Sequence, residues 1–116
     1  MTATDFVDRL REVVLAASVS DAIKMVVQPP GRRPAPDLVD VSRWFNALES
    51  SDQRMVERML KMVAHQSVFG LLSVLDSTRQ IESTAGPKGH FELRYIKDGQ
   101  DAILSGPDGE VLHELL

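Results

Sequence analysis

Residues 52–78, DQRMVERMLKMVAHQSVFGLLSVLDST, set the architecture of the chain. Apolar residues recur there every three or four positions, which predicts one amphipathic helix that begins at a capping box of Ser50 and Gln53. At 1.5 Å per residue this helix is roughly 40 Å long. A compact domain of this size has a radius of gyration of only about 13 Å. The predicted helix therefore spans the whole domain.

The two halves of this helix differ in polarity. The first half has one apolar side and one charged side, which carries Lys61 and His65. In the second half Phe69 and Leu72 occupy the same helical angles, so the charged side disappears. A helix that is apolar all round must be covered all round. We expect the C-terminal segment or another subunit to cover it, with a close backbone approach at Gly70.

Two short helices and a connector precede the long helix. Apolar spacing predicts a first helix over about 4–17, and Ser18 is the expected N-cap of a second one. Prolines stop the second helix, and residues 28–36 (QPPGRRPAP) form a proline-rich connector. A third helix over 38–48 follows, with Asp37 as its expected N-cap.

The third helix carries most of the bulky aromatic surface of its region. Trp44 is the only tryptophan, and Phe45 follows it directly in a chain with six aromatic residues. Because aromatic side chains bury large areas, we expect both to anchor the core.

The C-terminal part reads as a β-hairpin over residues 90–105. Apolar and polar residues alternate there, and Asp98-Gly99 is a strong type I′ turn signal. The expected cross-strand pairs are Tyr95 with Ala102 and Leu93 with Leu104. Residues 110–116 fit a short closing helix better than a third strand.

These elements define one α+β domain over residues 1–116. The predicted order is about four N-terminal helices, one of them the long central helix, then the β-hairpin and a short terminal helix. The length suits a single domain and leaves no room for two.

Composition argues against several functional classes. The chain has 116 residues, no cysteine and a net charge of −4, so disulfides and cysteine-ligated zinc are excluded. No clustered basic face is evident for nucleic acid, and no apolar run is long enough for a membrane helix. The N-terminus lacks the pattern of a secretory signal, which favours a bacterial-type cytoplasm.

Few residues are candidates for chemistry. The titratable ones are His65, Asp76, His90 and His113. They have no recognised metal-ligand spacing, and the chain lacks nucleophile-elbow and phosphate-loop motifs, so we expect no metal and no cofactor. Arg32 and Arg33, in the proline-rich connector, form either an anion clamp or a solvated linker tip.

The predicted helices and hairpin are too few to cover the wide apolar band of the chain. This favours a subunit interface and a homodimer. The expected interface residues are Met55, Met59, Met62, Phe69, Leu72, Ile96 and Ile103.

The leading hypothesis is a non-catalytic protein-interaction module. From Asp98 onward the chain has five acidic residues and no lysine or arginine, which would suit a partner with a basic surface. A specific version is a toxin-neutralising immunity or antitoxin-like protein. The rival from another class is a small hydrolase or ligand-binding enzyme with a histidine-containing pocket.

Overall fold

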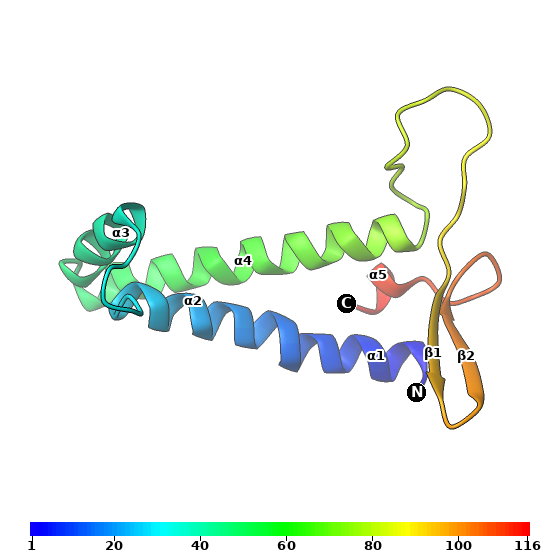
Figure 1. Cartoon of the computed structure of the whole chain (residues 1–116), viewed down its shortest axis with the longest axis horizontal. Coiled ribbons are helices and arrows are strands. Elements are labelled where there is room, and N and C mark those ends of the chain that lie inside the picture. Colours follow the sequence, from blue (N-terminus) through cyan, green and yellow to red (C-terminus); the bar gives the residue numbers. More distant parts are fainter.

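Two long antiparallel helices form the frame of the protein, as a computed structural model that describes all residues 1–116 shows (Figure 1). The first is a continuous rod of α1 (Ala3–Leu10), the π-helical segment η1 (Arg11–Ala16) and α2 (Ala17–Val27). The second is α4 (Ser50–Leu75). The other elements are α3 (Pro36–Asn46), β1 (Leu93–Lys97), β2 (Gln100–Ser105) and α5 (Leu112–Leu115). α3 lies at one end of the helical pair, the hairpin lies at the other, and α5 lies between the two long helices (Figure 1).

The predicted α+β class is confirmed in outline. The chain is helix-rich, with one two-stranded antiparallel hairpin and a short C-terminal helix. The number of helices differs from the prediction, because residues 3–27 form one rod. The protein therefore has three helical rods before the hairpin and α5 after it.

The first rod passes straight through Ser18, so the predicted new N-cap there is wrong. At 100° per residue, the apolar stripe around Val7 and the one around Ile23 are roughly 160° out of phase. The π-helical turn η1 holds more residues per turn than an α-helix, so it reduces this difference. Both stripes can then face α4 without a break in the helix.

Several helix ends differ from the predicted caps. Thr2 and Asp5 form a capping box that starts α1, with hydrogen bonds of 3.1 and 3.0 Å. α3 begins at Pro36 with Ala35 as its N-cap, so the expected cap at Asp37 is wrong. α4 has Glu49 as its N-cap and no side-chain cap, so the expected capping box there is wrong as well.

The two bulky aromatic residues of α3, Trp44 and Phe45, differ in burial. Phe45 is buried as expected, but Trp44 is 57% exposed, so the prediction that it anchors the core is wrong. The buried face of α3 is narrow because the helix packs mainly on the end of α2. Asn46 Nδ2 donates to the carbonyl of Val27 at 3.0 Å, and Gln53 Nε2 donates to the carbonyl of Phe45 at 3.0 Å.

The hairpin has the predicted turn but not the whole predicted register. Asp98 and Gly99 both have positive φ angles, +50° and +77°, as a type I′ turn requires. Tyr95 pairs with Ala102 as expected. Leu93 pairs with Ser105 instead of Leu104, because a β-bulge between Leu93 and Arg94 shifts the register by one residue.

The core is small and lies at the hairpin end. Its buried members are Ala3, Val7, Leu72 and Leu112. α5 thus covers one side of the second half of α4, which was one of the two expected coverings, but the expected covering all round is wrong because Leu71 is 60% exposed. Away from this cluster the chain is open: 11 of 116 residues are buried. The radius of gyration is 18.6 Å, against about 13 Å for a compact domain.

None of the helices combines the length and the apolar character that crossing a bilayer demands.

Gly70 provides a test of helix packing. The predicted close approach of another backbone to Gly70 is wrong. The neighbour is a side chain, because a Cβ on Gly70 would lie 2.6 Å from Nη1 of Arg79. That guanidinium is the far end of a flexible side chain and can move. We expect Gly70→Ala to stabilise the protein by roughly 0.5–1 kcal/mol in urea denaturation, through helix propensity. Gly99→Ala, at a positive φ, is the control and should destabilise it by about 1 kcal/mol. A Gly70→Ala variant less stable than wild type would contradict this account.

Candidate functional site

Asp76 is the centre of the most connected polar cluster. Its side chain is 2% exposed and lies just after the end of α4. Oδ1 accepts a hydrogen bond from Ser105 Oγ at 2.7 Å. Oδ2 accepts one from the backbone N–H of His113 at 2.8 Å, and Nδ1 of His113 lies 2.8 Å from the same oxygen. One carboxylate therefore joins the ends of α4 and β2 to the start of α5.

The local backbone presents Asp76 to these partners. Ser77 has a φ of +60°, which ends α4 at Leu75, three residues before the predicted Thr78. The backbone N–H groups of Thr78 and Arg79 then donate to the carbonyl of Ser73 at 3.0 and 3.1 Å. This left-handed turn closes the helix and leaves the Asp76 side chain free to face the C-terminal segment.

The hydrogen bonds outweigh burial in setting the charge of Asp76. Burial alone raises the pKa of this carboxyl, since a charged group loses hydration. The backbone N–H of His113, the hydroxyl of Ser105 and the backbone N–H of Leu112 lower it. The net effect is a pKa below the ordinary value of 3.8, so Asp76 is ionised at neutral pH.

Two histidines lie near the ring of Phe69. His113 meets the Phe69 ring edge-on, with ring centroids 5.2 Å apart. His65 stacks on Phe69 at 6.4 Å and is exposed. Of the sequence candidates, only His113 therefore contacts Asp76, because His65 lies eleven residues earlier, about 16 Å away along the axis of α4.

The cluster is not assembled as a nucleophile with its base. In a serine triad the hydroxyl bonds to the imidazole and the carboxylate bonds to the other ring nitrogen. Here the Ser105 hydroxyl bonds directly to Asp76, and Ser105 is itself buried. A carboxylate that accepts from a serine and from a helix N-terminus is typical of a structural cap. The arrangement fastens chain segments together.

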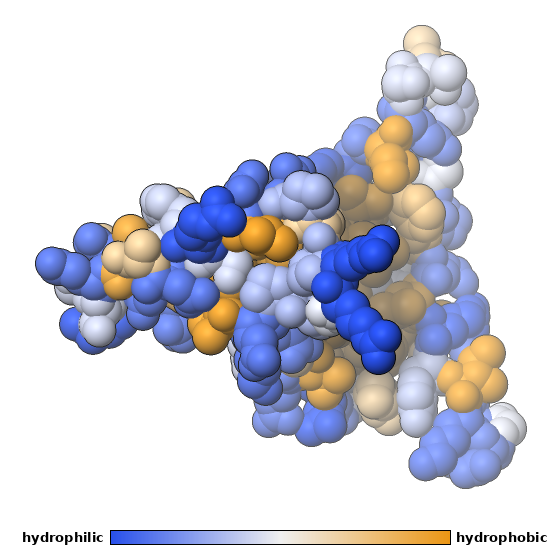
Figure 2. All heavy atoms as spheres, turned by 60° about the vertical axis from the view of Figure 1, so that its left-hand side comes forward, coloured by the Kyte–Doolittle hydropathy of each residue, from blue (hydrophilic) through white to orange (hydrophobic).

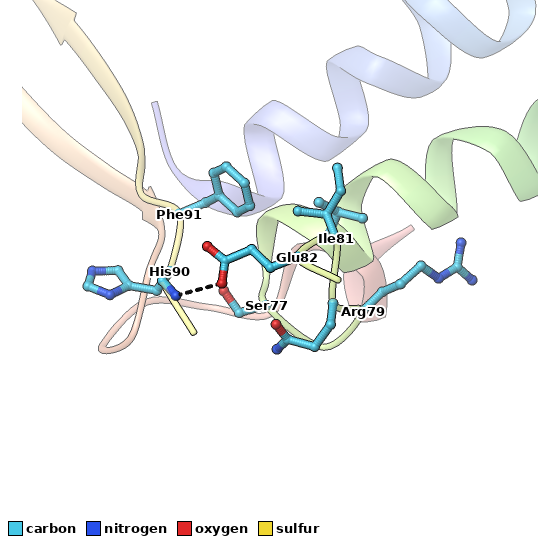
Figure 3. Close-up of a pocket in the computed structure, with 9 residues that line it drawn as sticks. Ser77, Arg79, Ile81, Glu82, His90 and Phe91 are labelled. Carbon is cyan, nitrogen blue, oxygen red and sulfur yellow. Dashed lines mark hydrogen bonds between the residues drawn. The ribbon is translucent and has the colours of Figure 1, made fainter. Parts of the chain in front are cut away.

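His90 lies in a different place, at a small cavity between the end of α4 and the loop before β1 (Figure 3). The cavity measures about 110 Å³, well below the 300 Å³ at which ligand pockets begin. Glu82 Oε2 accepts from the backbone N–H of Gly89 at 3.2 Å, and His90 Nε2 lies 4.0 Å from Glu92. No three histidine, aspartate or glutamate side chains meet in a way that could hold a metal ion.

The expected interface residues fall into two groups. Leu72 is buried in the chain's own core, and Phe69 is half-buried beside His113, so these two are covered without a second subunit. The residues that remain exposed are Met55, Met59, Met62, Ile96 and Ile103. Arg32 and Arg33 are exposed in the connector and form no ion pair.

A larger groove lies between the first helical rod and α4. It encloses about 600 Å³, which is within the range of ligand-binding sites. Its lining is Arg11, Leu15, Ala16, Val19, Ser20, Ile23, Lys24, Glu57, Lys61, Ala64 and His65. Of the sequence candidates, only His65 belongs to it.

The expected N-cap at Ser18 concealed this groove. It predicted a new helix, whereas η1 keeps the rod intact and brings Leu15 and Ala16 beside α4. The different phases of the two apolar stripes are the signal that could have revealed a continuous rod. Ser105 was likewise missed, because nothing in a hairpin pattern marks one serine as the partner of a distant aspartate.

No protein family, curated protein or solved structure matches this chain.

Removing the central carboxylate should detach α5. We expect Asp76→Ala to destabilise the protein by roughly 2–4 kcal/mol, because Ser105 and the backbone N–H of His113 lose a charged acceptor. Urea denaturation measures this, and amide exchange in residues 112–115 should rise. Asp108→Ala, at an exposed turn position, is the control and should change stability by about 0.5 kcal/mol or less. A loss below about 1 kcal/mol in Asp76→Ala would contradict the clamp.

The same carboxylate should make the free energy of unfolding depend on pH in the acidic range. Its pKa is lower in the folded protein than the ordinary 3.8, so its contribution is complete above pH 3.8 and declines as pH falls through the folded value. We expect the stability gap between wild type and Asp76→Asn to narrow as pH falls below 3.8. Comparing the two proteins cancels the contribution of Asp5, whose pKa the capping box also lowers. A gap that widens in acid would contradict the assignment.

Proposed function

We propose that this protein is a non-catalytic protein-interaction module. The observation that carries the proposal is the excess surface of the single chain. Its accessible area is 8572 Å², whereas a compact monomer of this mass exposes about 6,300 Å². The excess of roughly 2,300 Å² includes many apolar side chains, and Figure 2 shows several of them among hydrophilic ones on one face.

The most regular apolar surface is the methionine stripe on α4, formed by Met55, Met59 and Met62. These side chains are 55%, 63% and 68% exposed, and their spacing of four and three puts them on one side of the helix. The opposite side of α4, with Leu60 and Ala64, faces inward. Methionine side chains are flexible and polarisable, which suits a surface that receives another protein.

A second copy of the chain is the simplest partner. Large obligate dimers bury 2,000–5,000 Å² in total, or about 1,000–2,500 Å² per subunit. The excess surface of this chain lies within that range. Ile96 and Ile103, exposed on the outer side of the hairpin, supply further apolar area.

A partner with a basic surface stays a prediction, and so do the toxin-neutralising version and the cytoplasmic location. Among the five acids from Asp98 onward, only Asp101 has an ion-pair partner, Arg94 at 2.9 Å. The other four charges are available to a basic partner.

Light scattering coupled to size-exclusion chromatography tests the homodimer. We expect a species of about twice 12.9 kDa at micromolar concentration. The triple substitution Met55→Gln, Met59→Gln, Met62→Gln should shift it to the monomer mass without loss of helical circular dichroism, because the stripe lies outside the core. Val13→Gln, at an exposed position on the other rod, is a matched control that should stay dimeric. A wild-type monomer at every concentration would refute the dimer.

A further inference from the structure

The groove between the two long helices has an apolar floor. Leu15, Ala16, Val19 and Ile23 come from the first rod, and Ala64 comes from α4. Val19 is buried, whereas the other four are wholly or partly exposed. An apolar floor of this kind is more typical of a surface that another structural element covers than of a solvated surface.

The rims of this groove are basic, although the whole chain carries a net charge of −4. Lys24 and Ser20 line it on α2, and Lys61 and His65 line it on α4. The single acid is Glu57, which lies 3.5 Å from Lys61 and leaves Lys24 on the facing rim unpaired. An apolar floor between positive rims fits an apolar ligand flanked by carboxylates.

The chain already places such an element between the same two helices. α5 has the sequence LHEL followed by Leu116, and it lies between α1 and α4 (Figure 1). Its leucines pack on the core cluster. Arg11 donates to the carbonyl of Leu116 at 2.8 Å and also to that of Leu115. Arg11 also lines the groove, so the groove begins where this leucine-rich, acid-bearing helix ends.

We infer that the groove binds an acidic amphipathic helix of a partner protein. Apolar residues at positions i, i+3 or i+4, and i+7 of that helix cover Leu15, Val19 and Ile23, and its flanking carboxylates reach Lys24 and Lys61. This inference rests on the proposed interaction function and names the chemistry of one partner. That partner is acidic at this site, unlike the basic partner that the C-terminal charges would suit.

A helix fits the groove better than a small amphiphile does. Small-molecule sites enclose 70–90% or more of their ligand. Here the rim residues Ser20, Lys24, Lys61 and His65 are all exposed, so the groove is open along its length. η1 also lies at this position, and π-helical turns in helices are frequent at functional sites.

Two synthetic helical peptides test the inference by fluorescence anisotropy with the full chain. Both carry leucines at the spacing given above; one has glutamate at every flanking position and its twin has lysine. We expect the glutamate peptide to bind at least about tenfold more tightly at low salt. The double substitution Lys24→Glu, Lys61→Glu should abolish or reverse this preference. Lys88→Glu, in the exposed loop before β1, is the charge-matched control and should change affinity less than about twofold.

Three outcomes would overturn the inference. The two peptides bind equally, neither binds, or the preference for glutamate survives in the Lys24→Glu, Lys61→Glu variant. Dodecanoate is the competing ligand. If it binds, loses affinity in the double variant, and the glutamate peptide does not bind, the groove holds a small amphiphile and the helix is refuted. The methionine stripe shares no residue with the groove, so the dimer measured by light scattering reports separately on the proposed function.

Discussion

The ionised carboxylate of Asp76 holds three separate segments of the chain together. It accepts hydrogen bonds from Ser105 and His113, and so it ties the end of α4 to the end of β2 and the start of α5. A helix as short as α5 is not stable by itself in water. Held by Asp76, it places Leu112 on Leu72 and Val7 and completes the core.

This closure acts at one end of the molecule only. Beyond Arg11 the two long helices have no third element between them, and their facing surfaces form the groove. The outward side of α4 carries the methionine stripe, which the chain's own packing does not use. The low burial follows from a C-terminal segment that covers only part of the helical pair, and the projecting loop before β1 adds to the large radius of gyration (Figure 1).

Local patterns predicted the elements well where a local signal determines the outcome. The spacing of apolar residues fixed the long helix to within three residues at each end, and Asp98-Gly99 fixed the turn. Prediction failed where two signals competed. At Ser18 an N-cap residue indicated the start of a new helix, but residues 3–27 contain neither glycine nor proline, and a π-helical turn lets the hydrogen-bonded rod continue. The prediction that Trp44 anchors the core failed because the size of a side chain does not determine which residues surround it.

Residue spacing and turn signals along the chain were enough to predict the long helix and the hairpin, since both follow from local periodicity. Helix packing, in contrast, sets the contact of Asp76 with α5, the burial of Leu72 and the exposure of Met59. It also brings Lys24 and Lys61 to one groove with an apolar floor. These relations join residues that are far apart along the chain. They depend on the rotation and separation of packed helices, which a one-residue change of phase in η1 is enough to alter.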